Sequence, residues 1–278
     1  MKRETRVKPS SPITTWSEIN TKYQQYATKS ESSRWIFRGQ QDACWSLKPS
    51  LQRAMGRFQI ALPKMRLYEN RLLREFKRHF HRYSEYVPEA GEMLEWLTLM
   101  QHYGAPTRLL DWTYSFHVAL FFAIEHASDG QTCAVWAVNQ DRCWNMIADR
   151  LLVSVRRELE RDYPDSEALC WLLNEFREPL LWPRNSFRLN TRLAVQQGTF
   201  LIPMDLTRPF QDIFDASVAV ESGCWEKIDI VCSHTLITQT LTELQRMNIT
   251  RLSLFPGVDG LAQSLWHVIP LKHFWTYV

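Results

Sequence analysis

Residues 116–127 place the strongest constraint on the fold, because nearly all of them are apolar and the run VALFFAI lies at their centre. A helix that is apolar on every side has to be buried on every side. We therefore expect this segment to be a helix in the middle of a layered domain, with the hydroxyls of Thr113 and Ser115 available to cap its first turn. The apolar run is shorter than the roughly 18 residues that a membrane span requires.

Five other stretches have the composition of β-strands, since β-branched and aromatic residues in them are bounded by turn formers. They are residues 33–39, 107–112, 133–139, 191–203 and 225–232. The stretch 133–139 is apolar on both faces, and 191–203 is predicted to be a strand or hairpin with a bulge at Gly198. Helices and strands follow one another irregularly, which favours an α+β fold over a regular βαβ array.

The remaining regular structure is predicted to be helical. Residues 63–86 form a long basic helix with apolar residues at helical spacing, and residues 91–103 form a second helix that Gly104 ends. Residues 141–176 are charged and mostly helical, so we interpret them as an insertion or subdomain. An amphipathic helix is expected at 236–247, with Asn248 as its cap. We expect residues 1–15 to be a flexible arm and residues 16–278 to be a single domain.

Composition and charge exclude several classes of protein. The 278 residues include 12 Trp and 13% aromatic residues, which is far from the composition of a disordered chain. The net charge of +3 permits contact with nucleic acid but does not require it. The six cysteines are scattered, without the spacing of a zinc site, and no apolar stretch near the start is typical of a secretory signal. These features predict a cytoplasmic, bacterial-type protein with reduced cysteines, no metal and no membrane segment.

Four blocks of sequence resemble the FRG domain family. The first is WIFRGQ at residues 35–40, which holds the Phe-Arg-Gly tripeptide. The second and most specific is QHYGAPTRLLDWT at residues 101–113, followed by ALFFA at 119–123. The third is residues 190–200, and the last is LFPGVDGL at 254–261. Together they span about residues 30–265, so the resemblance implies an FRG domain that fills nearly the whole chain.

The resemblance implies a distant relative of the ADP-ribosyltransferase fold, with a mixed or antiparallel split β-sheet core and substantial helical insertions. It also implies a bacterial toxin–antitoxin or phage-defence setting. In that fold an early strand supplies an arginine that holds NAD, and Arg38 matches this role. A guanidinium can bind two oxygen atoms of a diphosphate or ribose, and Gly39 would let a ligand approach the backbone. The structural alternative is that Arg38 pairs with an aspartate such as Asp111 and braces two strands.

A corner between a strand and a helix supports the nicotinamide ribose in that fold, and Asp111, Thr113 and Ser115 match it. Hydroxyls and helix N-terminal N–H groups there suit polar ligand atoms, although plain capping by Thr113 and an ion pair of Asp111 explain the same residues. Tyr103 could stack on nicotinamide or fill the core. His102 is either an acid–base group or a structural histidine.

The third block departs from the expected pattern, because a late strand of that fold supplies a glutamate where this chain has Gln196 and Gln197. A neutral amide can bind a ribose hydroxyl but cannot stabilise a ribosyl cation by charge. Asp111, Glu175 and Asp205 are the carboxylates that could replace the glutamate. We therefore assign Arg38, Asp111 and Gln197 as candidate catalytic residues. The candidate NAD-binding residues are Arg38, Gly39, Tyr103, Thr113, Ser115 and Gln196.

The function that this pattern predicts is transfer of ADP-ribose from NAD, without a metal, to a macromolecule. RNA or DNA is favoured as the acceptor because the basic helix at 63–86 interleaves arginines, lysines and aromatics, although a solvated helix face explains the same pattern. A toxin of this kind would need an antitoxin protein. The first alternative is a module that senses NAD or a nucleotide without turnover. The second is a nuclease that uses His102 and Arg38.

Overall fold

The computed structural model describes residues 11–30, 32–160, 166–188, 190–220 and 223–268. Its centre is a six-stranded sheet in the order β4-β5-β2-β1-β3-β6. All pairings between these strands are antiparallel, so the expected α+β fold with an antiparallel sheet is confirmed. The strands are β1 (Trp35–Gln40), β2 (Leu110–Thr113), β3 (Thr132–Asn139), β4 (Leu181–Arg184), β5 (Gly198–Pro203) and β6 (Trp225–Val231).

The pairing between β1 and β2 is the shortest in the sheet. These strands pair at one register position, Phe37 with Thr113, whereas β1 pairs with β3 along its whole length. The three strands β4-β5-β2 and the three strands β1-β3-β6 are therefore two halves joined at a short contact. The end of β1 that carries Arg38, Gly39 and Gln40 is left unpaired on its β2 side.

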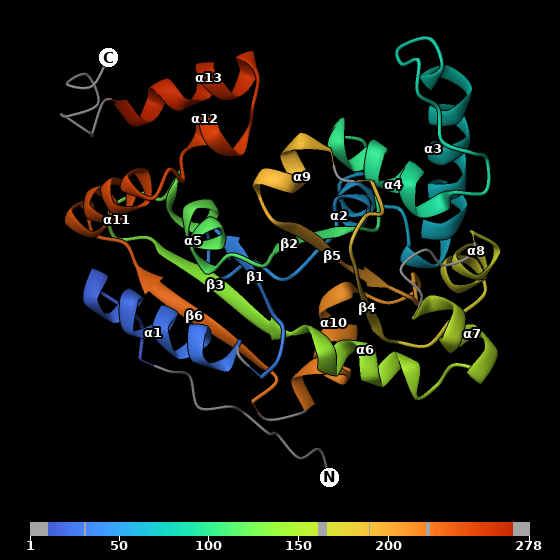
Figure 1. The fold of residues 1–278 in the computed structure, drawn as a ribbon, viewed down its shortest axis with the longest axis horizontal. Coiled ribbons are helices and arrows are strands. Elements are labelled where there is room, and N and C mark those ends of the chain that lie inside the picture. The colour runs from blue at the N-terminus through green and yellow to red at the C-terminus, as the bar shows by residue number, and fades with distance from the viewer. Residues whose placement is uncertain (1–10, 31, 161–165, 189, 221–222, 269–278) are drawn as a thin grey trace.

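One face of the sheet is covered by α1 (Trp16–Lys29), α5 (Phe116–Ile124) and α11 (His234–Arg246). The α5 helix lies at the centre of this layer (Figure 1), and it is buried on nearly all sides, as its apolar sequence predicted. Its N-cap is Ser115, whose hydroxyl accepts a hydrogen bond from the backbone N–H of Val118. The α1 helix begins with a capping box between Thr15 and Glu18.

Gly39 has a packing role, and it also belongs to the lining of the cavity described below, so the expected approach of a ligand to its backbone stays a prediction. A Cβ atom on Gly39 would lie 2.0 Å from the carbonyl oxygen of Ala119 and 2.6 Å from the nitrogen of Ala123. Both atoms belong to the backbone of α5, which cannot move as a side chain can. The glycine of the Phe-Arg-Gly tripeptide is thus required for the close approach of α5 to β1.

The opposite face packs against α6 (Gln140–Ala148) and α10 (Phe210–Ala216). Side chains of β3 alternate between the two layers: Val135 belongs to the α5 side, and Trp136 belongs to the α6 and α10 side. This confirms that residues 133–139 form a strand buried on both faces.

A third cluster of apolar residues lies beyond the β4 end of the sheet, at the right of Figure 1. It is built from α3 (Met65–Phe80), α4 (Met93–His102), α7 (Val153–Leu159) and α8 (Ser166–Asn174), together with β4 and β5. The residues expected to form a helical insertion, 141–176, therefore share a core with α3 and α4. Arg108 is fully buried beside this cluster, where it pairs with Glu69 of α3.

Several predicted elements differ from the structure. Residues 50–57, to which no helix or strand was assigned from the sequence, form α2 (Ser50–Arg57). The expected strand at 191–203 begins only at Gly198, because Asn190 caps the short helix α9 (Thr191–Val195). The bulge predicted at Gly198 is wrong; the left-handed residue is its neighbour Gln197, with φ 48°. The predicted C-terminal turns at Gly104 (φ 81°) and Asn248 (φ 58°) are confirmed.

Near the ends of the chain, residues 1–10 of the expected arm lie outside the described residues. Ile13 is buried, and it exchanges hydrogen bonds with β6, so the arm does not extend over Ile13. The chain continues after α11 into α12 (Arg251–Leu254) and α13 (Val258–Ser264). All six cysteines are free, as expected. None of the helices within the described ranges combines the length and apolarity that crossing a membrane demands.

Candidate functional site

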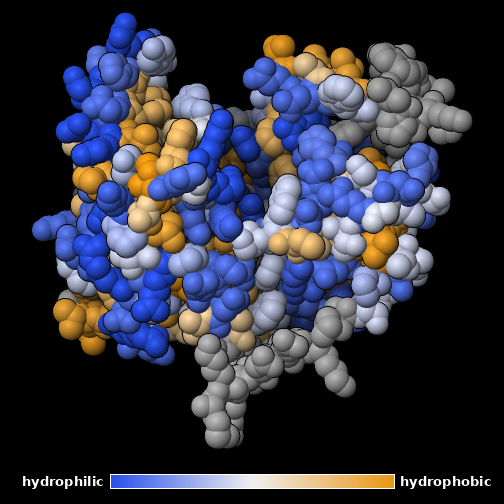
Figure 2. Space-filling model, turned by 180° about the vertical axis from the view of Figure 1, so that it is seen from behind, coloured by the Kyte–Doolittle hydropathy of each residue, from blue (hydrophilic) through white to orange (hydrophobic). Residues whose placement is uncertain are grey.

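A cavity of about 1020 Å³ lies at the unpaired end of β1. It is bounded by the last residues of β1, by the loop 41–48, by α2 and by Phe122 of α5. Its size reaches the upper end of the roughly 300–1,000 Å³ found for small-molecule and cofactor sites. Figure 2 shows a hollow in the upper middle of the molecule, bordered mainly by hydrophilic residues.

Arg38 lies at the wall of this cavity and is half-buried. Its Nη1 donates a 2.7 Å hydrogen bond to the main-chain carbonyl of Asp111, across the gap between β1 and β2. Its Nε is buried and has no hydrogen-bond partner within the described ranges. Arg38 therefore braces the two halves of the sheet, as the structural alternative expected, but it does so through only part of its guanidinium.

Among the described residues that line the cavity, the charged side chains are all basic: Arg38, Lys48 and Arg53. Burial lowers the pKa of Arg38, the charge of Asp111 opposes this decrease, and the charge of Arg53 adds to it. Arg38 and Arg53 thus repel each other in the unliganded protein. An anionic group between them would remove this repulsion, and an arginine is well suited to bind the oxygen atoms of a phosphate.

The loop 41–48 that forms one wall is held by hydrogen bonds from the sheet. Gln40 accepts a 2.6 Å hydrogen bond from the indole of Trp136, and its amide donates to the carbonyl of Ser46. Lys227 of β6 donates to the carbonyl of Ala43. Trp45 in this loop is 53% exposed and lines the cavity, so an aromatic face is available beside the cationic groups.

The carboxylate of Asp111 lies on the other side of the Arg38 contact. It accepts a 2.8 Å hydrogen bond from the amide of Gln101 and borders a small cavity of about 60 Å³, together with His102 and Arg192. Burial lowers the pKa of Arg192, and the charge of Asp111 opposes this decrease. The pKa of His102 is lowered by burial and then by Arg192, so His102 is neutral near pH 7. The charge of Asp111 thus acts on two arginines, Arg38 and Arg192.

Most of the other predicted cofactor-binding residues do not line the Arg38 cavity. The hydroxyl of Thr113 is buried and donates to the carbonyl of Gln196, while Ser115 caps α5. The amide of Gln196 is also buried and donates to the carbonyl of Leu254. These three side chains hold the corner together, because their polar groups are already paired within the protein.

Tyr103 and Gln197 are exposed and also lie outside the cavity lining. Tyr103 is 64% exposed, and its ring packs edge-on against His102. Gln197 contributes its carbonyl oxygen, which accepts from the backbone N–H of Tyr114.

Two of the three carboxylates expected to replace the missing glutamate, Glu175 and Asp205, lie away from Arg38 and its cavity. Glu175 borders a separate cavity with Arg66. Asp205 pairs with Arg208 and accepts hydrogen bonds from Thr207. Asp111 is left as the candidate that contacts the Arg38 region.

The sequence interpretation missed Lys48 and Arg53 as lining residues, because it assigned no helix to residues 50–57. The signal was present: Pro49 comes before a segment in which Leu51 and Met55 are separated by one helical turn. Leu51 and Met55 are both buried in a small apolar cluster. Because one face of α2 packs on this cluster, Gln52 and Arg53 on another face line the cavity.

The family model of the FRG domain matches residues 33–132. These residues include β1 with Arg38, α2, β2 and α5, and with them most of the cavity lining. The match agrees with the family resemblance of the first two sequence blocks, whereas the blocks at residues 190–200 and 254–261 lie outside the matched range. No curated protein and no solved structure matches the chain.

Proposed function

We propose that the cavity at the end of β1 binds NAD and that the protein transfers ADP-ribose from it. The observation that carries the proposal is that Arg38 borders a ligand-sized cavity in which the charged side chains of the described lining residues are all basic. A dinucleotide has a diphosphate for such cations and two flat rings for an aromatic surface such as Trp45. The FRG resemblance, which implies an ADP-ribosyltransferase relative, supports the same ligand.

In the proposed reaction, the bond between the nicotinamide nitrogen and C1 of the ribose breaks, and nicotinamide leaves as a neutral molecule. A nucleophile of the acceptor forms the new bond to C1 and gives up its proton. Positive charge develops on the ribose as the first bond breaks. We assign its stabilisation to Asp111, whose carboxylate is held by Gln101 and borders the small cavity on the other side of the Arg38 contact. This role requires the Asp111 carboxylate to turn toward the ribose when NAD is bound.

The test is release of nicotinamide and transfer of label from labelled NAD in cell extract. We expect Arg38→Ala to lower both by at least tenfold, and Asp111→Asn to lower turnover more than NAD affinity. Arg246→Ala, exposed on α11, is the matched control and should keep full activity. A folded Arg38→Ala protein with unchanged turnover would refute the proposal.

A sensor that binds NAD without turnover is the second candidate. It is favoured by the absence of any carboxylate among the described residues that line the cavity, and by the buried, paired amide of Gln196. Calorimetry that shows NAD binding, together with no nicotinamide release from any extract, would select this candidate over the enzyme.

The acceptor and the partner remain proposals from the sequence. The side chains of Arg71, Arg74 and Arg78 on α3 are exposed, which suits a nucleic-acid acceptor. Arg74 and Arg78 both pair with Glu75 on the same helix, which suits a solvated face. Labelled NAD offered with RNA, DNA or protein fractions of the extract would distinguish these acceptors, and an antitoxin would be identified by its suppression of the transfer.

A further inference from the structure

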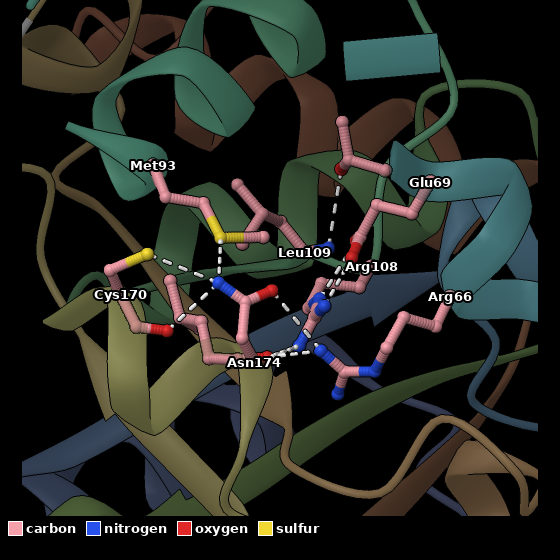
Figure 3. Close-up of polar contacts among 9 residues, drawn as sticks. Arg66, Glu69, Met93, Arg108, Leu109, Cys170 and Asn174 are labelled. Atoms are coloured by element: carbon pink, nitrogen blue, oxygen red, sulfur yellow. Dashed lines mark hydrogen bonds and ion pairs between the residues drawn. The ribbon is translucent and has the colours of Figure 1, made fainter. Parts of the chain in front are cut away.

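Two arginines from different segments converge on the end of α8. Arg108 and Arg66 both donate to the carbonyl oxygen of Leu173, over 2.8 Å and 2.9 Å. Arg66 also donates to the side-chain oxygen of Asn174. Figure 3 shows the two guanidinium groups side by side at this point.

Each of the three guanidinium nitrogens of Arg108 has a hydrogen-bond partner. Its Nη1 binds the Leu173 carbonyl, and its Nε and Nη2 bind the two carboxylate oxygens of Glu69. Nε and Nη2 point from the same edge of a guanidinium, and this edge matches a carboxylate with two parallel hydrogen bonds.

The Nη1 of Arg66 also donates to the Leu173 carbonyl, but the Nε–Nη2 edge of Arg66 has no partner within the described residues. Its Nε and Nη2 are both buried and make no hydrogen bond within the described part of the chain. In Figure 3 no dashed line ends on either of these nitrogens. Two buried charged donors without acceptors are costly, so an acceptor that binds this edge would stabilise the folded protein.

A cavity of about 450 Å³ between α3 and α8 is bordered by Arg66. Its lining includes Asn70, Trp171 and Arg177. Burial lowers the pKa of Arg66 to about 10, and the charges of Arg108 and Arg177 contribute to this decrease. The Nε and Nη2 atoms are themselves buried, so a ligand has to displace part of the cavity wall to bind them.

We propose that this cavity is a binding site for a carboxylate, which the Nε–Nη2 edge of Arg66 holds as the same edge of Arg108 holds Glu69. The rest of the lining favours a carboxylate over a phosphate. Glu167 and Glu175 balance the charges of Arg66 and Arg177 in the lining, so a singly charged anion meets less repulsion than a dianion. Asn70 and Arg177 are further donors for groups attached to the carboxylate. The site uses other residues than the Arg38 cavity and does not depend on NAD binding.

The experiment follows the Nε–H signal of Arg66 by nitrogen-edited NMR in the full chain. Arg66→Lys identifies the signal, because the variant lacks it. The probes are N-acetyl-glutamate, a capped tetra-glutamate peptide and inorganic phosphate, compared at equal ionic strength. We expect a saturable shift with the carboxylates in the wild type and in the matched control Arg74→Lys, and at least tenfold weaker binding to Arg66→Lys measured by calorimetry.

The two carboxylate probes distinguish the source of the ligand. Equal binding of both supports a small-molecule carboxylate, and at least tenfold tighter binding of the peptide supports an acidic side chain of a partner protein. An Arg66 signal that stays unchanged as the carboxylates are added overturns the proposal. Phosphate binding tighter than both carboxylates also overturns it. The wild-type signal decides the matter even if Arg66→Lys does not fold.

Discussion

Arg38 and Arg108 lie in the two most specific blocks of the FRG domain, but their environments differ. Arg108 is 0% exposed and is fully paired by Glu69 and the Leu173 carbonyl. Arg38 is half-buried, makes one hydrogen bond to the Asp111 carbonyl and faces a cavity with two other cations. The comparison shows that one arginine of the motif is paired within the protein, whereas the other is only partly paired beside a cavity, and this difference is the reason for choosing Arg38 as the candidate ligand-binding residue.

The largest loss of stability is expected when the buried ion pair between Arg108 and Glu69 is broken. Arg108→Met leaves the buried carboxylate of Glu69 without its partner, so the free energy of unfolding should fall by about 3–5 kcal/mol. Urea unfolding followed by circular dichroism measures the loss. The double variant Arg108→Met, Glu69→Leu should recover part of it. An Arg108→Met variant as stable as the wild type would contradict the structural role of Arg108 that separates it from Arg38.

Gly39→Ala tests the packing beside Arg38. The new methyl group would lie 2.0 Å from the Ala119 carbonyl, so α5 must move away from β1. We expect a loss of about 3 kcal/mol in the free energy of unfolding, at the upper end of the usual range for overpacked cores. Gly56→Ala is the control, because a Cβ there has open space. Equal stability of the two variants would contradict the close contact of α5 and β1.

Arg38→Gln should act mainly on the ligand. We expect the affinity for NAD to fall at least tenfold, about 1.4 kcal/mol, while the free energy of unfolding changes by about 1 kcal/mol through loss of the bond to the Asp111 carbonyl. Calorimetric titration and urea unfolding of the same preparation separate the two effects. A variant that is strongly destabilised but binds NAD normally would place Arg38 with Arg108, among the residues that hold the fold.

The smallest effect is expected for Thr113→Val, at the corner before α5. The substitution removes the hydrogen bonds of the Thr113 hydroxyl with the Gln196 carbonyl and the Ser115 N–H. Stability should fall by about 1 kcal/mol, and the affinity for NAD should not change. A tenfold loss of NAD binding would restore the cofactor-binding role that the sequence alone predicted for Thr113.

Much of the fold could be predicted because segments that are buried on both sides are apolar along their whole length. The apolar run of α5 and the strand at residues 133–139 were found because each is buried on both sides. Residues 191–195 were misassigned because a five-residue helix is too short to show helical periodicity, and its only strong signal is the cap residue Asn190. The antiparallel order of the strands required the structure, since strands far apart in sequence are neighbours.

The candidate site was predicted only in part. The family blocks identified Arg38 and Asp111, but residue type alone could not separate Arg38 from Arg108, whose partner Glu69 lies 39 residues away in the chain. Thr113, Ser115 and Gln196 were assigned to the ligand because the family resemblance implies that a corner and a late strand at these positions contact the nicotinamide ribose. Their hydrogen bonds within the protein depend on the packing of α9 and α12 around the corner, which no local sequence pattern reports.

The central claim is that Arg38 holds the diphosphate of NAD in the cavity at the end of β1. A crystal structure of the protein with NAD, or with an analogue that cannot be cleaved, tests it most directly. We expect diphosphate oxygens within about 3 Å of the guanidinium of Arg38, with Arg53 beside them and a ring against Trp45. NAD bound elsewhere, with Arg38 in contact only with the Asp111 carbonyl and the cavity empty, would contradict the account.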